Sequence, residues 1–196
     1  FEIDALADRL ITEKGGEAAF KRVKNYKHAT CISTNKVVVH GIPTDYKFKE
    51  GDIVGIDCGV FYKGFNTDMS ETRRVSAKSS KLKAQNSDEI DKFLETGKKA
   101  LDEAIKVAIP GNRIGHISKT IQDIVEKEGG YSVVRALIGH GVGKDLHEDP
   151  EVPGYLDKKI EKTPVLREGM TIAIEIIYNM GGFKVSYMNN DNWTIS

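Results

Sequence analysis

The sequence predicts an α+β fold, with helices beside a curved antiparallel sheet and two related halves in one domain. One observation is that segments with helical periodicity are interspersed with strands rich in β-branched residues. A second is a strand pattern, each copy carrying an acidic residue, that occurs twice in 196 residues. A chain of this length can bury one large core, so we expect a single domain over 1–196, with halves of about 1–85 and 86–196.

The repeated pattern begins with a Glu-Gly pair and places an acid in the strand that follows. Asp57 and Glu175 each lie six residues after the glycine of such a pair. An apolar block with a His-Gly step precedes each copy, at His40 and at His140. Two matches in the same order indicate an internal duplication in which each half supplies one histidine and one buried acid.

The first half is expected to contain a helix, two short strands and a long hairpin. Apolar residues at helical spacing predict the helix over 2–14, and a Gly-Gly pair ends it. Residues 29–33 and 37–40 are expected to form strands on either side of a turn. A buried strand then runs over 52–58.

The hairpin carries two acids. Lys63-Gly64 is a turn signal, and the return strand is expected from Phe65 to about residue 75. Asp57 and Asp68 therefore lie on paired strands. A carboxylate in an apolar strand needs a partner, because burying an unpaired charge is costly.

The second half is expected to contain two helices and three strands. A polar surface loop over 76–87 precedes it. The predicted segments are helices over 87–107 and 114–125, a strand over 131–134, a loop rich in Gly, His and acid over 139–153, an acid-bearing strand over 170–178, and a return strand from Phe183 after a Gly-Gly turn.

Composition excludes several classes of partner. Lys+Arg and Asp+Glu both number 29, so no charge excess favours nucleic acid or an anionic membrane. No run approaches the ~18 apolar residues of a membrane span. The two cysteines, Cys31 and Cys58, form no disulfide framework, and reduced thiols in a cytoplasmic protein are expected.

The residues that carry chemistry are acids and histidines. Several carboxylates with one imidazole suit Mn²⁺, Fe²⁺, Co²⁺ or Zn²⁺ better than a thiolate site does. Such a site can hold two ions ~3.5–4 Å apart, where a bridging water becomes a nucleophile. Histidines outside the ligand set can stabilise a developing oxyanion. We expect ordinary structural roles for His28 and His116.

Four motifs resemble those of the type I methionine aminopeptidases. They are VVVHGIP, GDIVGIDCGVFYKGFNTDMS, GHGVGKDLHEDPEV and EGMTIAIE, in this order, and the resemblance covers nearly the whole chain. It implies the pita-bread fold, a pseudo-two-fold α+β catalytic domain. It further implies a cytoplasmic, monomeric hydrolase that uses metal-activated water to remove the initiator methionine from newly made polypeptides, with the ribosome as a further partner.

The resemblance assigns roles residue by residue. It implies two divalent ions, Co, Mn, Fe or Zn. The implied metal ligands are Asp57, Asp68, His140 and Glu175, with Asp68 bridging the ions. The implied catalytic residues are His40, His147 and Glu175. The implied methionine pocket consists of Tyr26, Cys31, Leu146 and Trp193.

The sequence also departs from the family pattern. Ile176 follows Glu175 where the family has proline, Val39 replaces a common cysteine, and Leu146 stands where phenylalanine is usual. The family's opening helix and its fifth ligand, a bridging glutamate, have no match between Phe1 and Ser196. We therefore expect a chain truncated at both ends, and we expect these 196 residues alone to bind metal weakly or at one site and to have little peptidase activity.

Two alternatives stay open on the sequence. A prolidase or aminopeptidase P shares the fold and similar ligands, although the HGIP and Cys31-Ile32-Ser33 contexts favour the methionine enzyme. The other is a catalytically inactive pita-bread module that binds peptides or the ribosome. The unmatched fifth ligand favours this module, whereas the retained ligands count against it.

Overall fold

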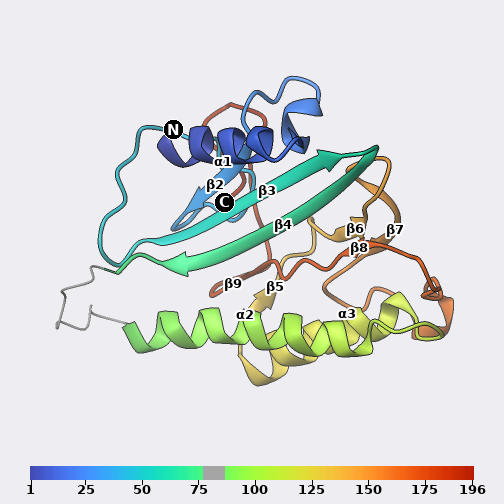
Figure 1. The fold of residues 1–196 in the computed structure, drawn as a ribbon. Coiled ribbons are helices and arrows are strands. Elements are labelled where there is room, and N and C mark those ends of the chain that lie inside the picture. Colours follow the sequence, from blue (N-terminus) through green and yellow to red (C-terminus); the bar gives the residue numbers. More distant parts are fainter. Residues whose placement is uncertain (77–86) are drawn as a thin grey trace. The chain divides into compact units, whose positions relative to one another are not determined.

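A computed structural model describes residues 1–76 and 87–196 (Figure 1). It forms two compact units. Unit 1 comprises Phe1–Ser87, Gly143–Leu146 and Ser186–Ser196, and unit 2 comprises Asp88–Val142 and His147–Val185. Two later segments thus belong with the first part of the chain. Most of the loop predicted over 76–87 lies outside the described residues.

Unit 1 is built on one antiparallel sheet. Its elements are α1 (Glu2–Glu13), β1 (Glu17–Ala18), a 3₁₀ turn (Ala19–Arg22), β2 (Thr30–Thr34), β3 (Ile53–Tyr62) and β4 (Phe65–Arg74). The ten-residue strand β3 pairs with β4 along one edge and with β2 and β1 along the other. Helix α1 lies beside β2 and β3 (Figure 1).

The predicted boundaries of unit 1 follow local chemistry. Two acids in the first turn of α1 favour its N-terminus, and Gly15, at φ 80°, ends the helix. Lys63 and Gly64 have φ of 48° and 89°, the left-handed pair that a two-residue hairpin turn requires. The predicted helix and hairpin are therefore present.

Unit 2 packs two helices with short strands. Its elements are α2 (Ser87–Val107, which begins at the end of unit 1), α3 (Ile114–Gln122), a π-helical continuation (Asp123–Glu128), β5 (Ser132–Val133), β6 (Gly139–Gly141), β7 (Glu148–Val152), a 3₁₀ turn (Ile160–Lys162), β8 (Ile172–Ala173) and β9 (Tyr178–Asn179). Strand β6 lies between β7 and β8, and β5 pairs with β9. The fully buried residues Ile117 and Ile121 of α3 pack in a core with Val133 and Val152.

Three predicted strands differ from the structure. Residues 37–40 form only an isolated bridge, Val39 with Ile195, because His40 is left-handed at φ 55° and ends the extended conformation. The acid-bearing strand over 170–178 is interrupted, because β8 pairs with β6 whereas β9 pairs with β5, and the residues between change partners.

The return strand predicted from Phe183 is also wrong. Ser186 instead exchanges backbone hydrogen bonds with Ser196, and Tyr187 bridges Ile195. The predicted loop over 139–153 contains two short strands, β6 and β7, which pair with each other. The segment is polar and rich in glycine, so its composition did not predict strands. Their pairing depends on partners distant in the sequence.

Candidate active site

Asp57 and Asp68 share one face of the β3–β4 hairpin in unit 1. Asp57 lies opposite Ser70, and Asp68 lies opposite Gly59. Since side chains alternate along each strand, these four positions point to the same side of the sheet. The two carboxylates are diagonal neighbours, a relation that places Cα atoms about 7–8 Å apart. A Cβ at Gly59 would lie 2.6 Å from the Thr67 carbonyl oxygen, so the absence of a side chain lets the two strands approach closely there.

The four predicted pocket residues gather in one apolar cluster of unit 1. Tyr26, Cys31, Leu146 and Trp193 belong to it, with Phe20 and other apolar neighbours. The Tyr26 and Trp193 rings meet edge to face, with centroids 4.9 Å apart. The Tyr26 hydroxyl lies 3.2 Å from the Cys31 sulfur and donates to the Thr30 carbonyl at 2.8 Å. We call Tyr26, Cys31, Leu146 and Trp193, with their apolar neighbours, the pocket cluster.

The pocket cluster lies directly beside Asp57. Cys31 of β2 is opposite Asp57 of β3, so their side chains leave the same face of the sheet. Burial, reinforced by the negative charge of Asp57, raises the pKa of the Cys31 thiol to about 12 although the Tyr26 hydrogen bond lowers it. Burial also raises the pKa of Tyr26. Both groups therefore stay neutral, which suits an apolar ligand.

Asn66 holds the segment that precedes Leu146, and sequence reasoning did not identify this role. Its backbone N–H donates to the Gly143 carbonyl at 2.6 Å, and its side-chain amide donates to the same carbonyl and to that of Lys144. Asn66 is buried in the turn-proximal part of β4. An asparagine at a hairpin turn is common, so only its buried position marks this role.

His40 adopts a conformation that few non-glycine residues take. Its φ is 55°, and the neighbouring Gly41 carbonyl accepts a 2.7 Å hydrogen bond from the Ile32 amide. A Cβ at Gly41 would lie 2.2 Å from the Ile32 carbonyl oxygen. The His-Gly step is therefore fixed against β2, and sparsely populated conformations of this kind cluster at functional sites.

Unit 2 brings together His140, His147 and Glu175. The buried His140 has Nδ1 2.8 Å from the Gly141 carbonyl, which can only accept, so Nδ1 carries the hydrogen. His140 Nε2 lies 3.2 Å from Glu175 Oε1. The His140 and His147 ring centroids are 4.3 Å apart, and His147 is exposed.

The side chains of His140, His147 and Glu175 are of the types that ligate a divalent cation. In the neutral ring with its hydrogen on Nδ1, Nε2 of His140 has a lone pair for a metal ion, and imidazole with carboxylate is a donor set that Mn, Fe, Co and Zn accept. The hydrogen bond to Gly141 fixes the ring orientation, as outer partners of metal-ligating histidines do.

Glycines flank His140 because the strands approach closely there. A Cβ at Gly139 would lie 2.3 Å from the Ala173 carbonyl oxygen, and one at Gly141 would lie 2.3 Å from that of Asp149. Neighbouring backbone occupies the space that a side chain at either position would need. Both glycines thereby hold β6 between its partners.

The comparisons with known proteins define the class. The model of metallopeptidase family M24 matches residues 1–194, so the chain belongs to this family. The methionine aminopeptidase of Clostridium perfringens is 39% identical over 99% of this chain and 73% of its own length. That of Borreliella burgdorferi is 41% identical over the same shares of the two chains.

Solved structures separate the two enzyme alternatives. The methionine aminopeptidase of Thermotoga maritima superposes with a TM-score of 0.88 and 37% identity, covering 99% of this chain and 74% of that one. The prolidase of Pyrococcus horikoshii superposes with a TM-score of only 0.65 and 27% identity, covering 88% of this chain and 44% of that one. The predicted pita-bread fold and the resemblance to methionine aminopeptidases are confirmed.

Family membership also establishes the type of chemistry. The protein is a hydrolase that uses divalent metal. The comparisons therefore favour an enzyme over the inactive binding module. Among the described helices, none is long and apolar enough to cross a membrane.

Proposed function

We propose that the protein removes the N-terminal methionine from newly made polypeptides. The observation that carries this proposal is the pairing of Cys31 with Asp57, which sets the pocket cluster beside a predicted metal ligand on one sheet face. A neutral, apolar cluster favours a thioether side chain, with about 0.8 kcal/mol gained per buried CH₂. The high similarity to methionine aminopeptidases supports the same substrate.

The proposed metal ligands are Asp57, Asp68, His140 and Glu175, holding two divalent ions of Co, Mn, Fe or Zn. In unit 1, the position of Asp57 and Asp68 on one sheet face supports this ligand assignment. In unit 2, the proximity of His140 to Glu175 supports it. When bound, the ions supply Lewis acidity that activates water and polarises the scissile carbonyl.

The chain's own groups have distinct tasks in this scheme. Glu175 accepts a proton from the attacking water and passes it toward the leaving amine. The exposed His147 donates a hydrogen bond to the carbonyl oxygen as negative charge develops there. His40, fixed by its His-Gly step, orients the scissile amide. The pocket cluster holds the methionine side chain and excludes water from it.

The proposal extends to cellular context. The substrate is the N-terminal peptide of nascent proteins, so the proposed location is the cytoplasm, with action at or near the ribosome. The protein is proposed to act as a monomer, because its predicted ligands all come from one chain.

A peptide assay of the full-length protein with Mn²⁺ or Co²⁺ tests the function. We expect cleavage of Met-Ala-Ser and little cleavage of peptides that begin X-Pro. Replacing the first Met by Ala removes three heavy atoms from the pocket and should lower kcat/KM by roughly 50-fold. A preference for X-Pro substrates would place the protein with the prolidases instead.

A further inference from the structure

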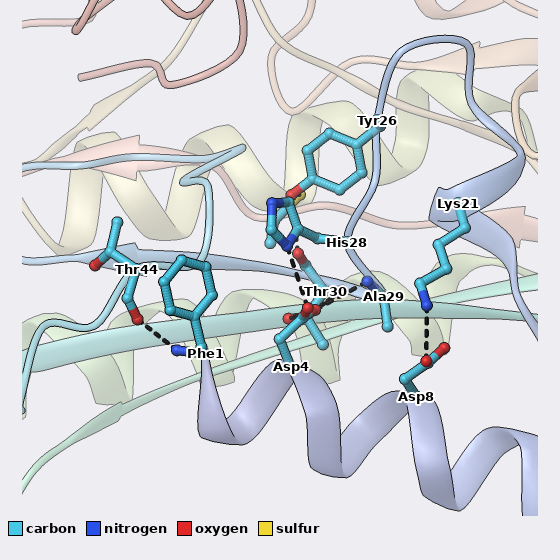
Figure 2. Close-up of polar contacts among 10 residues, drawn as sticks. Phe1, Asp4, Asp8, Lys21, Tyr26, His28, Ala29, Thr30 and Thr44 are labelled. Atoms are coloured by element: carbon cyan, nitrogen blue, oxygen red, sulfur yellow. Dashed lines mark hydrogen bonds and ion pairs between the residues drawn. The ribbon is translucent and has the colours of Figure 1, made fainter.

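Asp4 of α1 is surrounded by donors from the segment that leads into β2 (Figure 2). Its Oδ1 accepts hydrogen bonds from the Ala29 amide at 2.8 Å, the Thr30 amide at 2.9 Å and the Thr30 hydroxyl at 2.9 Å. Its Oδ2 lies 3.2 Å from Nδ1 of His28. The side chain is only 14% exposed, so this carboxylate forms part of the interior.

The same segment connects two residues of the pocket cluster. Tyr26 precedes it and Cys31 follows it. The Thr30 carbonyl accepts from the Tyr26 hydroxyl, so Asp4 and Tyr26 hold Thr30 from two sides. The His28 ring also contacts Tyr26 edge to face, with centroids 5.7 Å apart.

The donors have no access to water as a substitute acceptor. Ala29 and Thr30 are both 0% exposed. Without the Asp4 carboxylate, two amides and one hydroxyl would lose their shared acceptor in a buried position, and leaving buried donors unsatisfied is costly. The segment would have to move until these groups reached water or other acceptors, and Tyr26 and Cys31 would move with it.

We propose that Asp4 is a positioning residue for the methionine pocket. It acts through residues 28–30, fixing Tyr26 and Cys31, and does not touch the substrate. The identity of the substrate, methionine, rests on the proposed function. The position of Asp4 relative to residues 28–30 rests on the hydrogen bonds alone. It assigns to the first helix a part in substrate selectivity that no sequence motif indicates.

Two acids of the same helix are matched controls. Glu2 shares the first turn of α1, so Glu2→Gln reproduces any loss of favourable charge at the helix N-terminus. Asp8 makes an exposed ion pair with Lys21 at 2.7 Å, so Asp8→Asn removes a salt bridge of this helix without altering residues 28–30. The tested variants are Asp4→Asn, which keeps one acceptor oxygen, and Asp4→Ala, which keeps none.

The first measurement needs no catalysis. Trp193 is the single tryptophan of the sequence and packs on Tyr26, so its fluorescence reports the pocket cluster. We expect acrylamide quenching to increase in Asp4→Asn and further in Asp4→Ala, and to stay at the wild-type value in Glu2→Gln and Asp8→Asn. Should Asp4→Ala fail to fold, the nearly isosteric Asp4→Asn carries the test.

The second measurement is steady-state cleavage of Met-Ala-Ser. We expect KM to rise about tenfold in Asp4→Asn, the scale of one lost hydrogen bond to a charged group, with kcat and metal content little changed. Unchanged quenching and KM in both Asp4 variants would overturn the proposal. Equal effects in Glu2→Gln would also overturn it, because Asp4 would then act only on helix stability.

The two proposals fail in different ways. A full-length wild-type protein that does not cleave Met-Ala-Ser contradicts the proposed function. Increased quenching in the Asp4 variants of such a protein would still support the positioning role of Asp4 toward Tyr26, whereas unchanged quenching would contradict that role as well.

Discussion

Asp68 lies diagonally across the β3–β4 ladder from Asp57, on the same face of the sheet. Two carboxylates so placed repel each other unless a cation or hydrogen-bond donors compensate their charge. We therefore expect Asp68→Asn to lower the affinity for Mn²⁺ or Co²⁺ by at least about 100-fold, since even outer partners of metal ligands are worth 10–100-fold. Isothermal titration calorimetry measures this.

The control for Asp68 is Thr72→Ala. Thr72 is an exposed residue of the same strand and the same face, opposite Gly55. Its replacement should leave metal affinity unchanged. An Asp68→Asn protein that binds metal like the wild type would show that Asp68 is not a ligand.

His147→Ala tests the proposed oxyanion donor. We expect kcat to fall by about 10²–10³-fold, the effect of removing one such donor, while metal content stays the same. His116→Ala is the comparison, because His116 accepts a 2.9 Å hydrogen bond from the Arg113 amide at the start of α3. That variant should lose about 1 kcal/mol of stability and keep its kcat. Equal kcat in the two variants would return His147 to a structural role.

The Cys31 thiol should react slowly with disulfide reagents such as DTNB. Thiolate is the reactive form, and burial holds the Cys31 pKa at about 12, so the reaction should accelerate as pH rises toward that value. Cys58, which is less buried, should react first, and Cys31→Ser should abolish the slow phase. Rapid labelling of both thiols near pH 8 would contradict the buried placement of Cys31.

The same pKa predicts how stability changes with pH. Below the ordinary thiol pKa of about 8.5, Cys31 is protonated in both the folded and the unfolded state. Above it the unfolded chain releases the proton while the folded chain retains it, so the free energy of unfolding falls as pH rises toward 12. Urea unfolding of wild type and Cys31→Ala between pH 7 and 10 should diverge, with a shallower decline for the variant.

Gly141→Ala should destabilise unit 2. A methyl group there would lie 2.3 Å from the Asp149 carbonyl oxygen, and overpacking of this kind costs about 1–3 kcal/mol. Gly181→Ala is the control, since no atom lies within 4 Å of the added carbon and no left-handed φ opposes it. Thermal unfolding should separate the two variants, and equal melting temperatures would show that β6 can shift without cost.

Local signals in the sequence were enough for the elements that depend on near neighbours. Helix α1 and the β3–β4 hairpin follow from apolar spacing and from Lys63-Gly64, and the structure places both as predicted. The placement of Asp57 and Asp68 on paired strands followed from the same hairpin. The metal roles of these acids rest on the family resemblance and stay predictions.

Features set by distant partners could not be predicted. Glycine-flanked His140 was expected in a loop, yet it lies in β6, because Ala173 and its neighbours supply the ladder from a distant part of the sequence. Asp4 and Asn66 were overlooked for the same reason. An acid in a helical first turn and an asparagine beside a turn are ordinary local choices, and only contacts with residues 24 or more positions away give them a further role.

The two-residue turn at Lys63-Gly64 also has a consequence for the order of folding. It brings Asp57 and Asp68 together across only eleven residues, and such hairpins form within about 1–10 μs. Asn66 must instead capture carbonyls 77 and 78 residues away before Leu146 joins the pocket cluster, a closure that costs more chain entropy. The acids of unit 1 therefore become neighbours while the pocket cluster is still incomplete, and during synthesis they do so before residue 143 has been added.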